Sequence, residues 1–425
     1  MKKTRKRNLA DSRRARRRKQ GRGQRGSTLA ALTSSALALP GLLSDSARAD
    51  APTEFFDIDL SYSYYHEDDL PAEKNVLGID EERMTVHSFQ VHGKTPLPKT
   101  DRWDMDVDLM VESMSGASPW FVQRDPVTQG LVQVMSGPSI FDDRVDMNFT
   151  GNHYGDSSNS SYNIGFSLED DYRAVYIGWG RNKHFNDKNT TLSLGWGYSN
   201  DRVMPTDHET YGRLPEYPKE STNAFLGLSQ VFSKSAIVQS SLTYRYAWGF
   251  LSDPYKRAAV GADTEPDTRP EKRHQLTWLT RYRQHVEAAD GSLHVDFRYY
   301  YDSWDIQSLT VETAWYQSLF DYFQLVPAFR YYSQSGADFY QPVYATRPEN
   351  GYVSSDYRLS PFGALSMRIS AVTHFEGWPR DVAWEGSVSY QRYLSGATYA
   401  IDQPIEANPG LVDFSVLAIR LSARF

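Results

Sequence analysis

The stretch FSVLAIRLSARF, residues 414–425, carries apolar and polar side chains at alternate positions. Successive side chains of a β-strand point to opposite faces, so a period of two predicts a strand. One face of this strand would hold Leu417, Ile419, Leu421, Ala423 and Phe425, and the other would hold Ala418, Arg420, Ser422 and Arg424.

The same alternation recurs along the chain from Thr53 onward. In RWDMDVDLMVE (102–112) an apolar face alternates with three aspartates, while GSLHVDFRYYYDSW (291–304) and TTLSLGWGYSND (190–201) place Trp or Tyr at the end of the apolar face. A single strand of this kind would also suit a soluble sandwich. The length, the number and the aromatic ends of these strands together predict a transmembrane β-barrel, which must close because lipid cannot hydrogen-bond a sheet edge.

Sixteen strands are predicted, so the expected fold is all-β: a closed antiparallel transmembrane barrel with short periplasmic turns and long extracellular loops. The second strand is the least regular. Met84 and Val86 are in one phase and Phe89 and Val91 are in the other, which predicts a β-bulge. The predicted strands cover residues 55–65, 81–92, 102–114, 140–151, 160–169, 172–180, 189–200, 222–232, 235–247, 272–284, 291–303, 306–318, 322–334, 356–369, 381–394 and 412–425.

The lengths of the gaps between these strands give an internal check. With both termini in the periplasm, every odd-numbered gap lies outside the cell and should be the longer kind. Even-numbered gaps such as FSKS (232–235) and LFDY (319–322) are short, whereas the outer gaps near 170 and 304 are exceptions to the rule. The long gaps are all odd-numbered and cover residues 115–139, 201–221, 248–271, 335–355 and 395–411.

Composition excludes several other classes of protein. The chain has 425 residues, 14% of them aromatic, and no apolar run long enough for a transmembrane helix. It contains no cysteine, which excludes disulfides, thiolate metal sites and cysteine catalysis.

Residues 1–49 are predicted to be a secretory signal peptide, and residues 50–425 a single outer-membrane barrel domain. Thirteen Lys or Arg residues precede the apolar stretch at 29–43, and Ala47 and Ala49 provide a small-x-small cleavage site. An RNA-binding arm explains only the basic run, and the Arg13-Arg14 pair lacks the apolar residue expected after a twin-arginine signal, so Sec export is favoured. Cleavage after Ala49 leaves 32 basic and 51 acidic residues, a net charge near -19, which excludes a nucleic-acid binder.

The terminal aromatic residue, Phe425, is the expected assembly signal. An outer-membrane barrel closes by pairing its last strand with its first, and a terminal aromatic after alternating apolar residues is the usual feature recognised by the barrel-assembly machinery. We therefore expect the apolar phase of 412–425 to face lipid, with Phe425 at the inner interface.

Several stretches resemble an uncharacterised family of Gram-negative bacterial proteins, the domain of unknown function 3570 family. The resemblance implies an outer-membrane barrel with no established activity. Family members are often encoded beside a flavin transferase and a thioredoxin-like protein, which implies redox or metal physiology. The matching stretches are SGASPW (115–120), EDDY (169–172), FNDKNTTLSLG (185–195), GFLSDPYK (249–256), RYYSQSGADFYQP (330–342) and SSDYRLSPFGA (354–364).

If apolar residues face lipid, the opposite phase lines the lumen, and its charges gather on two walls. Such a transverse field would orient and pass polar or charged solutes, because lumen groups set selectivity. The acidic wall is predicted to hold Asp57, Asp59, Asp104, Asp106, Asp108, Glu112 and Asp146. The basic wall is predicted to hold Arg245, Arg281, Arg283, Arg298, Arg330 and Arg368.

The alternative is a lumen plugged by ion pairs that neutralise one another, or narrowed by loops that fold inward. The turn-rich outer stretches GFLSDPYK and SGADFYQP are expected to form ordered loops over the mouth, as a constriction or as a binding surface.

No catalytic residue, cofactor or metal site is predicted. The acidic stretch HEDD (66–69) could bind a cation or bridge lipopolysaccharide, but a solvated acidic loop is the simpler interpretation. HETYG (208–212) lacks the second histidine of a zinc protease, and there is no nucleophile elbow or phosphate-binding loop, so an outer-membrane hydrolase is the weaker hypothesis.

The sequence therefore predicts a monomeric or trimeric porin-like channel or transporter for a small polar or charged solute. The competing hypothesis is a non-conducting barrel that docks a periplasmic lipoprotein or redox partner. The other expected partners are outer-membrane lipid and the barrel-assembly machinery, and no nucleic acid is expected.

Overall fold

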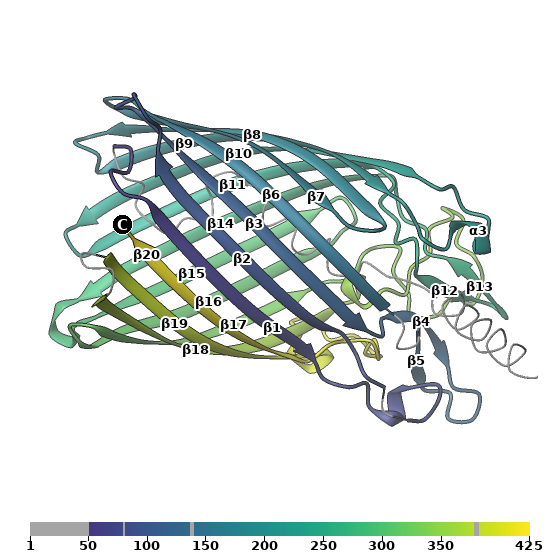
Figure 1. The fold of residues 1–425 in the computed structure, drawn as a ribbon. Coiled ribbons are helices and arrows are strands. Elements are labelled where there is room, and N and C mark those ends of the chain that lie inside the picture. Colours follow the sequence, from purple (N-terminus) through teal and green to yellow (C-terminus); the bar gives the residue numbers. More distant parts are fainter. Residues whose placement is uncertain (1–50, 80, 137–139, 378–381) are drawn as a thin grey trace, which may run out of the picture.

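Sixteen strands form one closed antiparallel barrel in the computed structural model, which describes residues 51–79, 81–136, 140–377 and 382–425 (Figure 1). The barrel is closed by its first and last strands, because β1 (Asp57–Glu67) pairs with both β2 (Thr85–Pro96) and β20 (Phe414–Arg424). Neighbours along the chain are neighbours in the barrel, apart from two small sheets that lie between barrel strands in sequence. The predicted fold is therefore confirmed.

The remaining barrel strands are long, which lets each of them cross a bilayer. They are β3 (Trp103–Gly116), β6 (Ile140–Tyr154), β7 (Ser158–Leu168), β8 (Tyr172–Phe185), β9 (Thr190–Val203), β10 (Tyr217–Ser233), β11 (Ala236–Gly249), β14 (Lys272–Val286), β15 (Gly291–Asp302), β16 (Gln307–Phe320), β17 (Phe323–Gln334), β18 (Phe362–Gly377) and β19 (Val382–Gly396).

The other elements lie in the connections. Strands β4 (Pro119–Arg124) and β5 (Leu131–Met135) form one hairpin, and β12 (Arg257–Val260) and β13 (Asp263–Pro266) form another. The short helices are η1 (Ala72–Lys74), α3 (His208–Tyr211), η2 (Glu287–Ala289), η3 (Tyr357–Leu359) and η4 (Ala397–Tyr399). Among the described residues, no helix is long and apolar enough to cross a membrane.

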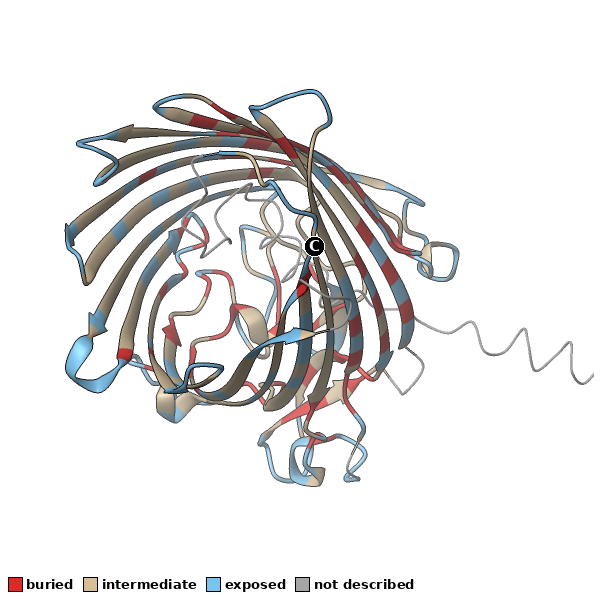
Figure 2. Ribbon diagram, turned by 60° about the vertical axis from the view of Figure 1, so that its left-hand side comes forward, coloured by how far each residue is buried: buried red, intermediate tan, exposed pale blue. Residues whose placement is uncertain are grey.

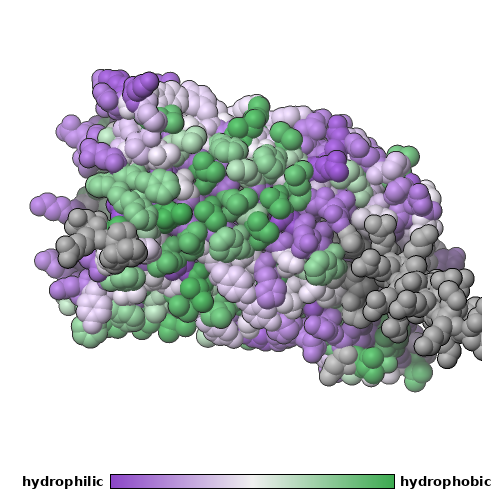
Figure 3. Space-filling model, in the orientation of Figure 1, coloured by the Kyte–Doolittle hydropathy of each residue, from purple (hydrophilic) through white to green (hydrophobic). Residues whose placement is uncertain are grey.

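The apolar phase of the strands faces outward. Trp278 on β14, Val388 on β19 and Ile419 on β20 are each 47–48% exposed, and exposed and less exposed residues alternate along the strands (Figure 2). On the face drawn in Figure 3, apolar side chains form a band between two polar ends. Each large apolar side chain left in water forgoes about 1.5–3 kcal/mol, so this band requires lipid. The chain is an outer-membrane β-barrel.

Both chain ends of the barrel lie at the periplasmic rim, and eight outer connections lie at the other rim (Figure 1). The predicted parity is confirmed, because the inner connections are short turns such as 234–235 and 321–322. We name the outer connections L1 (68–84), L2 (117–139), L3 (169–171), L4 (204–216), L5 (250–271), L6 (303–306), L7 (335–361) and L8 (397–413).

The predicted bulge in the second strand is wrong. Strand β2 keeps an unbroken register with both β1 and β3. Val86 is an inward residue of the regular alternation: it packs with Met84 and Met114 in a small buried cluster beside Tyr65. An apolar side chain can therefore face inward at the outer mouth, where loops cover it, without any change of register. The predicted signal peptide at 1–49 lies outside the described residues.

The seam between β1 and β20 is covered by aromatic residues at its periplasmic end. The backbone N–H of Phe425 donates to the carbonyl of Phe56 at 3.0 Å, and the Phe425 ring lies 6.1 Å from that of Phe56 and 6.5 Å from that of Trp384. Phe425 itself is 48% exposed, as a residue at the lipid interface can be.

Replacing Phe425 with Ala should slow barrel closure, because each aromatic pair at the seam contributes about 0.5–1.5 kcal/mol. The measurement is the folded fraction during refolding into detergent, judged by the heat-dependent shift in electrophoretic mobility. Phe320→Ala is the matched control: Phe320 lies at the same rim, stacked on Tyr322 and away from the seam. Equal refolding rates for the two variants would show that Phe425 has no special role in barrel closure.

Candidate functional site

The predicted acidic residues lie close together on one side of the barrel interior. Asp57 and Asp59 are on β1, four of the acids alternate along β3, and Asp146 is on β6. These strands are neighbours in the order β1, β2, β3, β6. We call the seven residues the acidic wall.

Cations interleave with the acidic wall. Lys94 on β2 places its Nζ 3.3 Å from Asp104 and 3.7 Å from Asp106. On the same strand, the His92 ring lies 2.7 Å from Asp108 through its Nδ1 atom. The negative charge of β3 is thus partly balanced by its neighbouring strand, in a pattern of cross-strand pairs.

Both ends of the acidic wall are also paired. Arg144 on β6 is buried and lies 3.7 Å from Glu112 and 3.6 Å from Asp146. Across the closing seam, Arg420 on β20 lies 3.0 Å from Asp59, and Arg424 pairs with Asp57 at 2.6 Å. Among the described residues, seven carboxylates therefore face four Lys or Arg side chains and one histidine, which leaves the wall acidic.

The basic residues lie on the neighbouring strands β11, β14, β15, β17 and β18. Five of them gather near one level. Arg245 lies apart, because its register partner on β14 is Gln275, six residues before Arg281 and thus about 20 Å away along the strand. Arg245 donates to the Ser221 hydroxyl at 3.2 Å. We call Arg281, Arg283, Arg298, Arg330 and Arg368 the basic wall.

Two carboxylates that the sequence analysis missed complete the basic wall. Asp296 on β15 and Glu312 on β16 are register partners, and they stand between Arg281 and Arg330 in one cross-strand row. Both follow the inward phase of their strands; Asp296 is two residues before Arg298, so strand phase alone could have identified it. Like charges in direct opposition are destabilising unless cations flank them.

Arginines do flank this acidic pair. Asp296 accepts from Arg283 and lies 3.6 Å from Arg281. Glu312 accepts from Arg330 at 2.6 Å and from Arg368 at 3.0 Å. Four of the five arginines thus share two carboxylates, and Arg298 pairs with neither, so the wall keeps a positive excess.

The interior beside the basic wall is open to solvent. Arg298 is exposed although it points inward, and it forms no ion pair with any described residue. The Arg330 side chain is 46% exposed and that of Asp108, across the lumen, is 43% exposed. Inward-facing charged side chains of both walls are therefore accessible to solvent.

The outer mouth is different, because loops L5 and L7 meet there in a buried ionic cluster. Asp356 accepts from Arg358 at 2.8 Å and from Arg269 at 2.8 Å, and it lies 3.7 Å from Lys256. Arg269 also binds Asp267, and Arg358 also binds Asp253, each at 2.7 Å. Three cations and three carboxylates balance within this cluster, which we call the cap cluster.

Electrostatics keep Asp356 ionised. Burial alone would raise the pKa of this carboxyl, but Arg358, Lys256 and Arg269 outweigh burial and hold its pKa well below the usual value. Burial raises the pKa of Asp267. Asp356 is thus the anion on which the three cations of the cap cluster depend.

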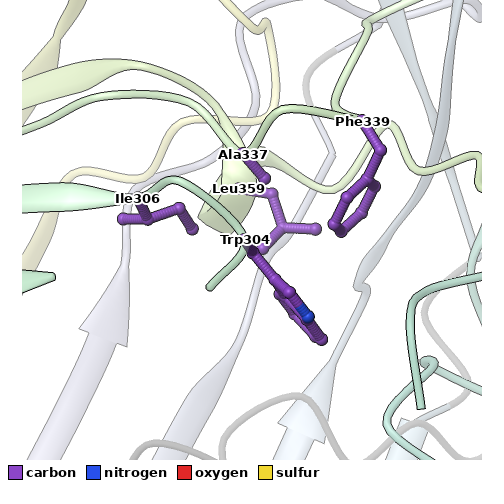
Figure 4. Close-up of a cluster of buried hydrophobic side chains, with 5 residues drawn as sticks. All are labelled: Trp304, Ile306, Ala337, Phe339 and Leu359. Carbon is purple, nitrogen blue, oxygen red and sulfur yellow. The ribbon is translucent and has the colours of Figure 1, made fainter. Parts of the chain in front are cut away.

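Other contacts join loops L8 and L2 to L7 and to the cap cluster. The Asn408 amide of L8 donates to the Tyr340 hydroxyl and to the Ser355 carbonyl of L7, at 2.8 and 3.0 Å. Lys256 donates to the carbonyl of Pro119 on β4 at 2.8 Å. An apolar core lies under this layer and consists of Trp304, Ile306, Ala337, Phe339 and Leu359 (Figure 4).

The expectation of ordered loops over the mouth is thereby met by GFLSDPYK and SGADFYQP, which lie in L5 and L7 and contribute Asp253, Lys256, Phe339 and Tyr340 to these contacts. Two acids of the stretch HEDD pair with arginines: Glu67 accepts from Arg83 at 2.9 Å, and Asp68 pairs with Arg392. HETYG coincides with α3 in L4.

Comparison with solved structures returns outer-membrane proteins of low sequence identity. A bacterial polysaccharide outer membrane secretin is 6% identical, with 87% of this chain and 97% of that chain covered and a TM-score of 0.45. The loop L8 deletion mutant of OmpT from Vibrio cholerae is 8% identical (87% and 98% covered, TM-score 0.42). OccK3 (OpdO) from Pseudomonas aeruginosa is 9% identical (87% and 95% covered, TM-score 0.39).

At these identities and TM-scores, no residue role of those proteins can be assigned to this chain. None of the curated proteins compared with the chain matches its sequence. A family model does match: it is described as a protein of unknown function (DUF3570) and covers residues 29–398, most of the chain and all but the last of the barrel strands in full. The chain belongs to the DUF3570 family.

Proposed function

We propose that this barrel provides a selective path across the outer membrane for a small charged solute, with anions favoured at the basic wall. The observation that carries the proposal is the exposure of inward-facing Arg298 and Arg330, opposite the exposed Asp108. A charged group that meets water inside a barrel lowers the energy of an oppositely charged solute there. The proposed role is passage without chemistry, so no catalytic residue is assigned.

The cap cluster favours a second candidate function. Six buried or half-buried charges that tie L5 to L7 close part of the outer mouth, which would suit a non-conducting barrel that docks a periplasmic lipoprotein or redox protein. In either case the barrel would reach the membrane through the barrel-assembly machinery and be held there by outer-membrane lipid.

A liposome-swelling assay separates the two candidates. Vesicles containing the purified barrel are diluted into solutions of small organic anions, cations and neutral sugars of matched size. The proposal expects swelling, fastest for the anions, because the basic wall has a positive excess. Vesicles that do not swell, although the barrel in them is folded, would favour the docking function. Equal swelling rates for anions and cations would show that the basic wall does not set the charge selectivity.

A further inference from the structure

Three buried carboxylates meet at the outer rim, next to the acidic wall and apart from the basic wall. Asp142 is the third residue of β6, while Glu169 and Asp171 belong to L3, the turn between β7 and β8. One oxygen from each residue lies within 4.8 Å of the oxygens from the other two. The three residues are only 1%, 6% and 2% exposed.

The cationic charge near this cluster is small. Arg144 lies 3.5 Å from Glu169 through its Nε atom, but the same guanidinium also pairs with Glu112 and Asp146 of the acidic wall. Among the described residues, Arg144 is thus shared by three buried carboxylates, and the neighbouring cation Lys219 lies 3.9 Å from a further one, Asp201. Several ionised carboxylates cannot be held in low dielectric without further positive charge.

Individual oxygens in the cluster lack donors. The Glu169 carboxylate is fully buried, and neither of its oxygens accepts a hydrogen bond from the described residues; only the 3.5 Å approach of Arg144 touches it. Asp171 accepts from the Tyr255 hydroxyl at 2.7 Å through Oδ2, whereas its Oδ1 is buried without a donor among the same residues. A buried polar atom left in this way calls for a ligand.

The electrostatics of the turn agree with this geometry. Burial raises the pKa of Glu169 to about 8 and that of Asp171 to about 7. Neighbouring carboxylates, among them Asp142, contribute to both of these raised values. A positive ion in contact with these oxygens would oppose both effects.

We propose that Asp142, Glu169 and Asp171 bind one divalent cation, and that its chemistry is that of Ca²⁺. All three ligands are hard oxygens, which suit Ca²⁺ and Mg²⁺, not the softer metals that prefer His or Cys. Ca²⁺ bonds of about 2.4 Å allow two ligands to stand up to about 4.8 Å apart. Mg²⁺ has shorter bonds and retains several waters, which a buried site accommodates poorly.

The proposed ion would lie where several outer connections meet. Tyr255 of L5, which donates to Asp171, also accepts from the backbone N–H of Thr206 in L4 at 3.1 Å. Met204 N–H donates to the Asp171 carbonyl at 2.7 Å. A cation on Asp171 would therefore fix L3 against both L4 and L5, so its expected effect is stability of the outer mouth. This inference is independent of solute passage.

The test is calorimetric titration of CaCl₂ into the detergent-solubilised barrel after chelator treatment and free of lipopolysaccharide. We expect one site per chain, a weaker response to MgCl₂, and slower proteolysis of L4 and L5 when Ca²⁺ is bound. Glu169→Gln and Asp171→Asn keep the side-chain shape and should weaken Ca²⁺ binding at least about ten-fold, because affinity follows the ligand charge. Asp402→Asn, at an exposed acid of L8, is the matched control and should bind as the wild type does.

Absence of a stoichiometric Ca²⁺ site in the folded wild-type protein would overturn the proposal. So would unchanged Ca²⁺ affinity in folded Glu169→Gln and Asp171→Asn, since the ion would then lie elsewhere. If either variant fails to fold, as shown by a missing heat-dependent mobility shift, the test rests on the wild-type protein alone. In that case protection of L4 and L5 by Ca²⁺ supports the site, and equal proteolysis with Ca²⁺ and with chelator contradicts it.

Discussion

Replacing Asp356 with Asn should open the outer mouth. The substitution removes the anion shared by Arg358, Arg269 and Lys256, and leaves these buried and half-buried cations with only Asp253 and Asp267 to balance them. Removing one partner from a buried ionic network costs about 3–5 kcal/mol, enough to release loops whose local stability is a fraction of that of the whole barrel.

Two measurements check this prediction: limited proteolysis of L5 and L7, and ion flow through the barrel in a planar bilayer. Both should increase in Asp356→Asn while the barrel strands stay folded. Asp338→Asn is the matched control, because Asp338 is exposed in the same loop and its side chain takes no part in the cap cluster. Intact loops in Asp356→Asn would show that the cap is held by its apolar core alone.

The same cluster sets the response of the wild type to acid. Because the pKa of Asp356 lies below its unfolded value, its contribution to stability is complete above about pH 4 and is lost as the pH falls through the native pKa. The raised pKa of Asp267 acts in the opposite direction, since the native state takes up that proton more readily. Mild acid should therefore leave the cap closed.

Reversing the charge of Arg281 and Arg283 together should turn the ion preference of the lumen towards cations. The change amounts to four charge units on one wall, next to Asp296, which would lose both of its arginine partners. A unit charge about 6 Å from a passing ion changes its energy by about 0.7 kcal/mol in water, so four units change it by about 3 kcal/mol before screening. We expect the anion-to-cation permeability ratio to fall by at least about ten-fold.

The measurement is the reversal potential in a salt gradient across a planar bilayer. The control is the double variant Arg102→Glu with Arg181→Glu, which carries the same change in charge. Arg102 lies in a periplasmic turn and Arg181 is exposed near the same rim, so neither belongs to the basic wall. Equal shifts in the two double variants would mean that total charge, and not the basic wall, sets selectivity.

Much of the barrel could be predicted from sequence, because strand phase is a local property. The alternation around Ile419 or Val295 indicates which side chains face lipid, and each strand carries this information in its own sequence. Boundaries were less predictable. Strand β10 begins at Tyr217, five residues before its predicted start, and β18 begins at Phe362, six residues after its predicted start.

The loops could not be predicted in the same way. The alternation through 356–361 resembles a strand, yet Leu359 is buried in the apolar core under the cap and Asp356 is at the centre of the cap cluster. Those positions depend on partners about 90 to 100 residues away in sequence, such as Arg269 and Lys256. No local period encodes such contacts. The hairpins β4–β5 and β12–β13 were missed for the same reason, since they pack on other loops and show no lipid-facing band.

Single-channel recording of the purified wild-type barrel in a planar bilayer tests the central claim most directly, namely that a water-filled lumen with opposed charged walls runs beneath the cap. We predict discrete, ion-selective openings that become larger or more frequent in Asp356→Asn. A silent bilayer for both proteins, with the barrel shown to be inserted and folded, would contradict the claim.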